Sequence, residues 1–397
     1  MSTRALEVWM RNSLAGILCK TDEDEYIFTY DERYLEREDA RPVSLTLPLR
    51  REEYVSPFLF PFFDGLIPEG WLLEKVSETW QIDWSDRFGL LGVSCLDTVG
   101  AISIRRCCDD ELSDDSSSSF DVLPSASLTD EILDSYAADA VEKGITVPGV
   151  QKKLSVPLFE GLRACIIKPQ VKEFRSMPEA ECLVMDMAEK LGIRTAEHAL
   201  IPYDDGVLYI VRRMDRVFHV DGSMEKLNME DFCQLSGRLT DAKYKSSYEQ
   251  CGKVIRQYSS RPGADLIEFF IRVVFSFITG NSDMHLKNFS LMESEVGGGY
   301  VLSPAYDLLP VNVIMPEDTE EMALTLNGKK RKLKRKDFIA FAETLKLSSS
   351  HAENLMDSLT GKKRLLLEMV EESQLPEDMK ETFASLIISR IASLERI

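Results

Sequence analysis

The chain lacks a long hydrophobic run. Of its 397 residues, 44% are hydrophobic, yet the apolar stretches at 269–278 and 386–391 are far shorter than the roughly 20 residues that span a membrane. The first residues pass directly into an alternating, strand-like pattern without the features of a signal peptide. We therefore expect a folded cytoplasmic protein with no membrane partner.

Cysteine and histidine are also sparse, and positively charged residues are outnumbered by negatively charged ones. None of the eight cysteines forms a C-x-x-C pair, so we expect reduced, mostly buried thiols rather than disulfides or zinc ligands. The chain has 47 Lys and Arg residues against 67 Asp and Glu residues, a net charge of −20. This balance argues against a protein that coats nucleic acid by itself, but it allows DNA contact through a basic partner.

The length predicts two or three domains. Alternating strand patterns, another strand or extended edge at 43–49 and a mostly helical stretch at 54–92 predict a compact mixed α/β subdomain at 1–106. We expect an acidic, serine-rich linker at 107–128, because this sequence has too little apolar surface to pack.

Beyond the linker the pattern changes from strands to helices. Residues 129–216 are rich in strand patterns, starting near 144–157, and contain one long helix at 179–191 that Gly192 should end. Residues 217–397 read as mainly helical. An Asn-Gly pair within them, at 327–328, predicts a tight hairpin turn. The expected fold class is α+β.

The most informative motif lies at 280–291, where Asp283 precedes Asn288 by five residues and an apolar run follows. A further Asp, Asp307, lies downstream. Protein kinases space their catalytic Asp and metal-binding Asn in this way, with a second metal-binding Asp later in the chain. One carboxylate must face the acceptor hydroxyl, while an amide oxygen and a second carboxylate hold Mg²⁺ against the phosphates. The spacing alone also allows a Mg²⁺-dependent hydrolase or a chance match.

His285 lies inside this motif. Imidazole can bind a metal, but no other histidine stands at ligand spacing. We therefore expect His285 to form a hydrogen bond within the loop or to the nucleotide.

Lys168 ends an apolar strand pattern. A buried lysine is costly without an anion, so we expect a phosphate or carboxylate partner. Glu181, at the start of the following helix, is the candidate. Taken alone, a surface lysine at a strand end is the simpler interpretation.

Two further segments could complete a nucleotide site. Residues 144–153 place glycines, backbone donors and two lysines between predicted strands, but they match neither the Walker loop nor G-x-G-x-x-G. A basic hairpin is an equal alternative for them. Residues 208–216 leave a strand and turn polar, as a hinge between kinase lobes would, with Met214 near adenine and Asp215 at the ribose. The alternative there is a strand that ends in a charged turn.

In this order, the pieces resemble the HipA family of bacterial serine/threonine kinases, the toxins of type II toxin–antitoxin modules. The resemblance runs through nearly the whole chain. The segments that carry it include Phe63-Asp64-Gly65-Leu66-Ile67-Pro68-Glu69-Gly70, the loop at 147–153, Glu230-Asp231-Phe232-Cys233-Gln234, and the runs at 283–291 and 304–308. It implies a bilobal, protein-kinase-like α+β fold with a β-rich N-lobe at 129–216, a mainly helical C-lobe at 217–397 and a small mixed α/β N-terminal subdomain.

The resemblance also implies a site for ATP and Mg²⁺. Asp283 would be the catalytic base, and Asn288 and Asp307 the Mg²⁺ ligands. The residues implied to bind ATP are Val147, Gln151, Lys153, Lys168, Arg212, Met214, Asp215 and His285, with Glu181 as the partner of the lysine.

Two positions depart from the family pattern. Family members autophosphorylate a serine in the phosphate loop, and Thr146 stands at that position here. Arg212 replaces a hinge glutamate, although a backbone contact would survive that change.

For function, the resemblance implies an ATP-dependent serine/threonine protein kinase toxin. Its substrates would be translation components such as aminoacyl-tRNA synthetases, and its partner a small helix-turn-helix antitoxin, HipB-like, that contacts operator DNA. A catalytically silent co-repressor that binds the antitoxin on DNA is the second interpretation. A small-molecule or lipid kinase is the third.

Overall fold

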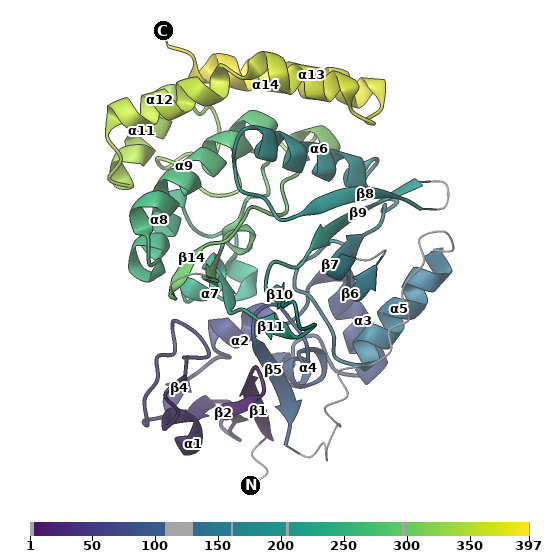
Figure 1. The fold of residues 1–397 in the computed structure, drawn as a ribbon, viewed down its shortest axis with the longest axis vertical. Coiled ribbons are helices and arrows are strands. Elements are labelled where there is room, and N and C mark those ends of the chain that lie inside the picture. Colours follow the sequence, from purple (N-terminus) through teal and green to yellow (C-terminus); the bar gives the residue numbers. More distant parts are fainter. Residues whose placement is uncertain (1–3, 108–129, 160–161, 204–205, 296–297, 397) are drawn as a thin grey trace. The chain divides into compact units, whose positions relative to one another are not determined.

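A computed structural model describes residues 4–107, 130–159, 162–203, 206–295 and 298–396 (Figure 1). The predicted linker at 107–128 lies outside these residues except for Cys107. The chain divides into two compact units. Unit 1 comprises Met1–Lys168 and Asp215–Thr240, and unit 2 comprises Pro169–Met214 and Asp241–Ile397.

Unit 1 begins with a five-stranded antiparallel sheet in the order β4-β3-β2-β1-β5. Its strands are β1 (Arg4–Met10), β2 (Ser13–Lys20), β3 (Tyr26–Tyr30), β4 (Tyr54–Ser56) and β5 (Ile102–Arg106). Alternate residues of β1, namely Leu6, Val8 and Met10, are buried, as the two-residue period of a strand requires. The strand pattern predicted at the N-terminus is confirmed.

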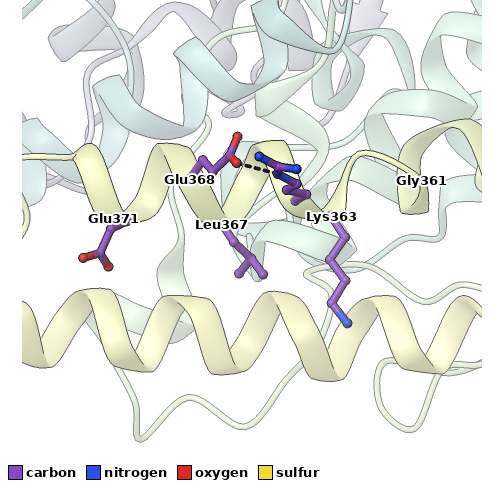
Figure 2. Close-up of a pocket in the computed structure, with 6 residues that line it drawn as sticks. Gly361, Lys363, Leu367, Glu368 and Glu371 are labelled. Carbon is purple, nitrogen blue, oxygen red and sulfur yellow. Dashed lines mark hydrogen bonds and ion pairs between the residues drawn. The ribbon is translucent and has the colours of Figure 1, made fainter.

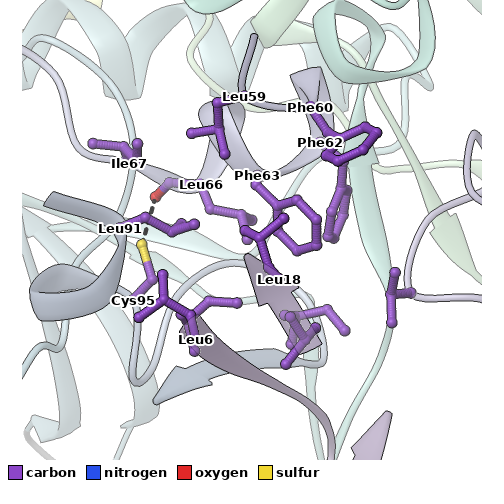
Figure 3. Packing of buried hydrophobic residues seen from close by; sticks show 14 of the residues in the cluster. Leu6, Leu18, Leu59, Phe60, Phe62, Phe63, Leu66, Ile67, Leu91 and Cys95 are labelled. Carbon is purple, nitrogen blue, oxygen red and sulfur yellow. Dashed lines mark hydrogen bonds between the residues drawn. The ribbon is translucent and has the colours of Figure 1, made fainter. Parts of the chain in front are cut away.

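Helices α1 (Glu32–Leu35), α2 (Pro61–Leu66), α3 (Gly70–Trp80) and α4 (Arg87–Ser94) complete this part of the unit. The stretch at 54–92, predicted as mostly helical, holds three of them after the short strand β4. Their apolar faces and the sheet share one core, part of which is drawn around Phe63 and Leu66 (Figure 3). The ring centroids of Phe28 and Phe63 are 5.6 Å apart.

The strand or extended edge predicted at 43–49 is wrong. The amide of Leu47 donates to the carbonyl of Ser44 over 3.0 Å, so the chain turns back on itself. The buried hydroxyl of Tyr30 explains this turn, because it accepts from the amide of Val43 at 2.9 Å and donates to the carbonyl of Leu47 at 2.5 Å. A tyrosine from β3 thus takes the place of a neighbouring strand.

The rest of unit 1 is a second set of short elements. They are α5 (Asp130–Glu142), β6 (Leu154–Phe159), β7 (Leu162–Lys168), β10 (Arg216–Phe218), β11 (Met224–Lys226), β12 (Met229–Asp231) and α7 (Phe232–Leu235). β6 and β7 form an antiparallel hairpin, as do β10 and β11. β6 begins later than the strand predicted near 144–157, because residues 144–153 form an irregular loop.

The motif at 230–234 has a structural role within unit 1. The carboxylate of Glu230 accepts hydrogen bonds from the hydroxyl of Ser44 at 2.6 Å and the amide of Leu45 at 2.8 Å. Gln234 takes part in a capping box at the start of α7 and also donates to the carbonyl of Phe62 over 2.8 Å. Burial raises the pKa of Glu230 to about 7. The hydrogen bonds from residues 44 and 45 therefore end on a carboxyl group that titrates near neutral pH.

Unit 2 contains one helix and two strands before a mainly helical part. The first three elements are α6 (Met177–Lys190), β8 (His198–Tyr203) and β9 (Gly206–Arg212). The helix predicted at 179–191 is confirmed as α6, and Gly192 follows its end with a φ of 80°. β8 and β9 pair antiparallel.

The mainly helical part is built around α9. Its elements are α8 (Tyr248–Tyr258), α9 (Pro262–Thr279), β13 (Ser290–Glu293), β14 (Tyr300–Leu302), α10 (Val311–Ile314), α11 (Arg335–Thr344), α12 (Ser349–Thr360), α13 (Lys363–Glu372) and α14 (Glu377–Leu394), with a short 3₁₀ turn at Leu286–Asn288. Another 3₁₀ turn, at Thr240–Ala242, lies where the chain passes from unit 1 to unit 2. Most side chains of α9 are buried, so it is the central core helix. None of the helices in the described part of the chain is long and apolar enough to cross a membrane.

The predicted Asn-Gly turn is confirmed. Asn327 and Gly328 have φ values of 47° and 74°, and Leu326 and Lys329 exchange backbone hydrogen bonds of 2.7 and 2.9 Å around them. These are the features of a two-residue hairpin loop.

Candidate active site

The catalytic segment, defined as residues 280–291, follows directly on α9 of unit 2. The helix ends at Gly280, whose φ of 69° is the left-handed conformation that terminates many helices. The amide of Asn281 donates to the carbonyl of Ser276 over 2.8 Å, which closes the helix end. β13 begins two residues after Asn288. The predicted catalytic residues therefore lie in a tight connection between two fixed elements.

Asn281 holds the backbones of the two predicted acidic residues close together. Its Oδ1 accepts a hydrogen bond from the amide of Asp283 at 3.1 Å, and its Nδ2 lies 3.5 Å from the carbonyl oxygen of Asp307. Asp307 has a φ of 53°, which is uncommon for a non-glycine residue and often marks a functional site. Tyr306 adds a tether, because its hydroxyl donates to the carbonyl of Lys287 over 2.9 Å. The structure thus brings Asp283 and Asp307 together around one asparagine side chain.

Asn288 is oriented by its own amide group. Its Nδ2 donates to the main-chain carbonyl of Asp283 over 2.8 Å, and the residue is buried. Because the nitrogen is used in this way, the oxygen Oδ1 is the atom that suits a hard cation such as Mg²⁺. With the carboxylate of Asp307 it would provide the oxygen ligands that this ion prefers.

Tyr244 was not predicted, although it contacts the predicted catalytic base. Its hydroxyl donates to Oδ1 of Asp283 over 2.5 Å, and its ring meets the ring of buried His285 edge-on, with centroids 4.8 Å apart. Tyr244 stands 39 residues before Asp283 in an irregular segment, so no periodicity or motif spacing marks it. His285 lies inside the segment as expected, packed against this tyrosine.

Glu181, Arg212 and Met214 are the other predicted site residues of unit 2. Glu181 is fully buried on α6. Burial, followed by the charges of Glu181, Cys182 and Asp307, raises the pKa of Tyr209 on β9 well above its ordinary range. The charges of Glu181 and Asp307 thus both contribute to the raised pKa of this phenol.

The end of β9 carries the predicted hinge. The guanidinium of Arg212 lies 3.0 Å from the carboxylate of Glu197. The backbone amide of Arg212 donates to the carbonyl of Glu197 over 2.8 Å. Met214 is half-buried. The contacts of these residues with adenine stay a prediction.

The phosphate-loop segment, defined as residues 144–153, belongs to unit 1. Its start is fixed: the amide of Thr146 donates to the carbonyl of Asp97 over 3.0 Å, and its hydroxyl donates to the carbonyl of Ser94 over 2.6 Å. Thr146 and Val147 are both buried. The predicted autophosphorylation position is thus anchored through its own hydroxyl group.

The end of the phosphate-loop segment has two features that suit a bound phosphate. Gly149 has a φ of 119°, a conformation that favours glycine, and the lysine ammonium rests against it, since a Cβ atom there would lie 2.2 Å from Nζ of Lys153. Nε2 of Gln151 is buried without a hydrogen-bond partner among the described residues. Buried donors of this kind usually have a partner. An oxyanion over the segment would supply one.

Lys168 and Asp215 complete the predicted residues of unit 1. Lys168 is 2% exposed at the end of β7, as the prediction of a buried lysine requires. Its pairing with Glu181 of unit 2 stays a prediction. The carboxylate of Asp215 accepts hydrogen bonds from the amide of Gly100 at 2.7 Å and from the guanidinium of Arg216 at 2.9 Å. Asp215 is therefore part of a buried ion pair of unit 1, and its ribose role stays a prediction.

A hollow beside α13, with a volume of about 610 Å³, is not this site (Figure 2). It is lined by Gly361, Lys363, Arg364, Leu367, Glu368 and Glu371. Arg364 and Glu368 pair across one helical turn at 2.6 Å. None of the predicted catalytic or nucleotide-binding residues lines it, and exposed ion pairs of this kind are ordinary surface features.

Two family models match the chain. The HipA N-terminal domain model matches residues 6–105, and the HipA-like C-terminal domain model matches residues 145–364. Together they cover the mixed N-terminal subdomain, the phosphate-loop segment and the catalytic segment.

Curated relatives and a solved structure agree with these matches. A protein of Sinorhizobium fredii named "Putative kinase Y4mE" is 27% identical over 100% of both chains. The "Serine/threonine-protein kinase toxin HipA" of Shewanella oneidensis is 24% identical over 80% of this chain and 77% of that protein. The solved complex of HipA, HipB and operator DNA from Shewanella oneidensis contains a chain that matches with a TM-score of 0.77 at 19% identity, covering 97% of this chain and 96% of that one. The predicted α+β, protein-kinase-like fold class is confirmed.

Proposed function

This chain belongs to the HipA family, and from that premise we propose that it is an ATP-dependent serine/threonine protein kinase. The single observation that carries the proposal is the arrangement of the catalytic segment, in which Asn281, Asn288 and Tyr244 all form hydrogen bonds with Asp283. Tyr244 holds the carboxylate and the two asparagines hold the backbone of Asp283, an arrangement that suits a group that must meet an acceptor hydroxyl at a defined angle.

In the proposed reaction Asp283 accepts the proton of the acceptor serine or threonine hydroxyl. Tyr244 holds the carboxylate in place through its hydroxyl donor, and it is a positioning residue. Asn281 keeps the backbones of Asp283 and Asp307 close together. The task of these residues is therefore positioning, which is the larger part of catalysis in phosphoryl transfer.

ATP and Mg²⁺ fit the residues present. Bound Mg-ATP would supply the phosphoryl group, and its metal ion would supply positive charge that neutralises the phosphates during phosphoryl transfer. Oδ1 of Asn288 and the carboxylate of Asp307 would hold the metal ion. Gly149 and Lys153 would cradle the phosphates, and the buried amide nitrogen of Gln151 would gain a partner. Val147, Lys168, Arg212, Met214, Asp215 and His285 are the further proposed ATP-binding residues, with Glu181 as partner of Lys168.

The same family membership supports a role as the toxin of a toxin–antitoxin module. We propose a HipB-like helix-turn-helix antitoxin as partner, with DNA contacted only through it, because a net charge of −20 suits a basic partner. A relative in the solved structures is bound to HipB and operator DNA. The proposed substrate is a translation component such as an aminoacyl-tRNA synthetase.

Autophosphorylation at Thr146 is part of the proposal. The hydroxyl donates to the carbonyl of Ser94, so it must leave this contact before it can accept phosphate. The modification would therefore release the start of the phosphate-loop segment from the N-terminal subdomain.

The proposal is tested with purified full-length protein, radiolabelled ATP and a recombinant aminoacyl-tRNA synthetase panel. Asp283→Asn should reduce phosphate transfer by about 10²- to 10⁴-fold, the range for loss of a general base. Glu371→Gln removes the charge of an exposed carboxylate near the end of α13 and should leave transfer unchanged. Failure of the wild-type protein to bind nucleotide or to transfer phosphate to any acceptor, itself included, would sink the proposal.

A silent co-repressor is the second candidate. The observation in its favour is that the carboxylate of Asp215, the proposed ribose ligand, already accepts from Gly100 and Arg216. Expression of wild type and Asp283→Asn without the antitoxin separates the two. Growth arrest by the wild type alone supports the kinase, whereas no arrest by either, with retained operator binding in complex with the antitoxin, supports the co-repressor.

A further inference from the structure

Outside the proposed ATP site, three ligating side chains of unit 2 converge between α6 and β8. Cys182 and Asp186 are four residues apart on α6, so they lie on the same face of the helix. His198 is the first residue of β8. The ligating atoms of all three lie within 4.8 Å of one another, and no second such trio of His, Cys, Asp or Glu side chains was found in the described part of the chain.

The polar contacts of His198 require a positive charge, either a cation or a proton, between its ring and Asp186. Nδ1 lies 2.8 Å from the carbonyl oxygen of Ala196, which can only accept, so Nδ1 carries the ring hydrogen. Nε2 then faces Oδ1 of Asp186 at 3.2 Å with its lone pair. An imidazole lone pair and a carboxylate oxygen repel at this distance unless a positive charge lies between them. Either a second ring proton or a metal ion meets that requirement.

We propose that Cys182, Asp186 and His198 form a binding site for a zinc-type divalent metal ion. Two ligands of a tetrahedral zinc ion, at their usual bond lengths, lie about 3.3–3.6 Å apart. The observed separations are 3.2 Å between Nε2 of His198 and Oδ1 of Asp186, and 3.8 Å between Sγ of Cys182 and Oδ2 of Asp186. These two separations involve different oxygens of the Asp186 carboxylate, and the ligating atoms of all three residues lie within 4.8 Å of one another, so side-chain rotations would draw them together around one ion.

The surroundings also match those of a metal site. A metal-bound histidine commonly donates its other ring N–H to a backbone carbonyl, which orients the ring. The carbonyl of Ala196 lies in position to accept this hydrogen bond from His198. The side chain of His198 is 3% exposed and that of Asp186 is 51% exposed. An ion can thus enter from the aspartate side, and a water molecule can complete four ligands.

Metal binding at this site requires the Cys182 thiol to lose its proton. Burial, followed by the carboxylates of Asp186 and Glu181, raises the pKa of Cys182 to about 12. The metal ion therefore has to displace the thiol proton when it binds.

A bound ion would clamp α6 to β8 one residue from Glu181. Because Glu181 is the proposed partner of Lys168, the clamp would hold in place the helix that carries it. The metal site itself is independent of kinase activity and can be tested without it.

The test uses the tag-free, full-length protein, stripped with EDTA and titrated with Co²⁺ and then Zn²⁺. We expect about one equivalent of Co²⁺ with a thiolate-to-cobalt charge-transfer band, displaced by Zn²⁺, and a higher Tm with the ion bound. The band should be absent in Cys182→Ser. Asp186→Asn and His198→Gln should each weaken binding by about tenfold or more.

Matched controls separate this site from others. Cys251→Ser replaces a buried thiol on α8, and His351→Gln an exposed histidine on α12. Both should bind Co²⁺ as the wild type does. Cobalt at Asn288 and Asp307 would give no thiolate band.

Several results would overturn the proposal: no thiolate band in the wild type, a band that persists in Cys182→Ser, or equal loss in Cys251→Ser. If Cys182→Ser does not fold, Asp186→Asn decides. Its carboxylate is half-exposed, and unchanged affinity in that variant would leave a plain His–Asp hydrogen bond in place of a metal site.

Discussion

The phosphate-loop segment of unit 1 and the catalytic segment of unit 2 differ in how they use polar groups. In the catalytic segment the side-chain amide of Asn281 accepts from the backbone amide of Asp283, and that of Asn288 donates to the backbone carbonyl of Asp283. In the phosphate-loop segment, Nε2 of Gln151 is buried without a partner among the described residues, and Gly149 adopts a backbone that other residues reach only under strain. The contacts around Asp283 are already made in the folded protein, whereas the phosphate-loop segment carries a cost that a bound anion would remove.

This difference predicts that equivalent substitutions act in opposite directions on stability. Removing an amide from the catalytic segment should reduce both stability and activity. Removing one from the phosphate-loop segment should reduce nucleotide binding but increase stability.

The largest effect is expected for Asn288→Leu. It removes the hydrogen bond to the carbonyl of Asp283 and a proposed Mg²⁺ ligand. We expect phosphate transfer to fall by roughly 10³-fold, since removal of one electrostatic contact to the transition state costs about 10²–10³. The free energy of unfolding should fall by about 1–2 kcal/mol. Kinase assays and urea denaturation measure the two quantities, and a variant with transfer within tenfold of wild type contradicts the assignment.

The next largest effect is a pH dependence of the free energy of unfolding of unit 1, and it is due to Glu230. Burial raises its pKa from 4.5 to about 7, so between these values the folded state binds more protons than the unfolded state. Its contribution to stability is therefore fully present below pH 4.5 and is lost as the pH rises through 7. The shift corresponds to about 3 kcal/mol.

The control for this effect is Glu230→Gln, which cannot titrate. The difference in unfolding free energy between wild type and variant, measured in urea, should decline by about 3 kcal/mol between pH 4.5 and 8. A difference that is flat or rises with pH is inconsistent with a buried carboxyl group of raised pKa.

Gly149→Ala tests the glycine of the phosphate-loop segment. The new Cβ would lie 2.2 Å from Nζ of Lys153, so either the lysine or the loop has to move. We expect the KM for ATP to rise roughly 10- to 100-fold, because a strained backbone position costs about 1–3 kcal/mol. Gly222→Ala is the matched control, since its φ is also positive, at 87°, but nothing lies within 4 Å of its added Cβ. Equal effects of the two variants on KM would argue against a cradle at Gly149.

The smallest effect is expected for Gln151→Leu, and it sharpens the comparison most. A buried donor without a partner costs about 1–3 kcal/mol, so its replacement by an apolar group of similar size should raise the free energy of unfolding by about 1 kcal/mol. ATP affinity should fall by about tenfold, the cost of one hydrogen bond to a charged group. Isothermal titration and denaturation check the two signs. A loss of stability together with unchanged ATP affinity would place Gln151 outside the proposed site.

The sequence predicted the features whose parts are adjacent in the chain. Asp283 and Asn288 share one segment, and the stop at Gly192 and the turn at Asn327 depend on local backbone chemistry. Such features survive in any tertiary context, and the structure has each of these elements where the pattern indicated it.

The sequence could not predict contacts made across long separations. Tyr244 reaches Asp283 from 39 residues away, and the hydroxyl of Tyr30 replaces a strand at 43–49 with a turn. The cysteines form no C-x-x-C pair, and the i, i+4 spacing of Cys182 and Asp186 on a predicted helix was the signal that could have indicated their cluster.

The contact between the hydroxyl of Thr146 and the carbonyl of Ser94 makes the N-terminal subdomain a thermodynamic partner of the phosphate-loop segment. Where the nucleotide also binds differently with this contact formed and broken, a ligand that prefers one of the two states alters nucleotide affinity by some factor. Reciprocity then requires the nucleotide to alter the affinity of that ligand by the same factor. A protein bound to the N-terminal subdomain could thus regulate the proposed kinase activity without touching a phosphate, and either binding affinity would report the size of that regulation.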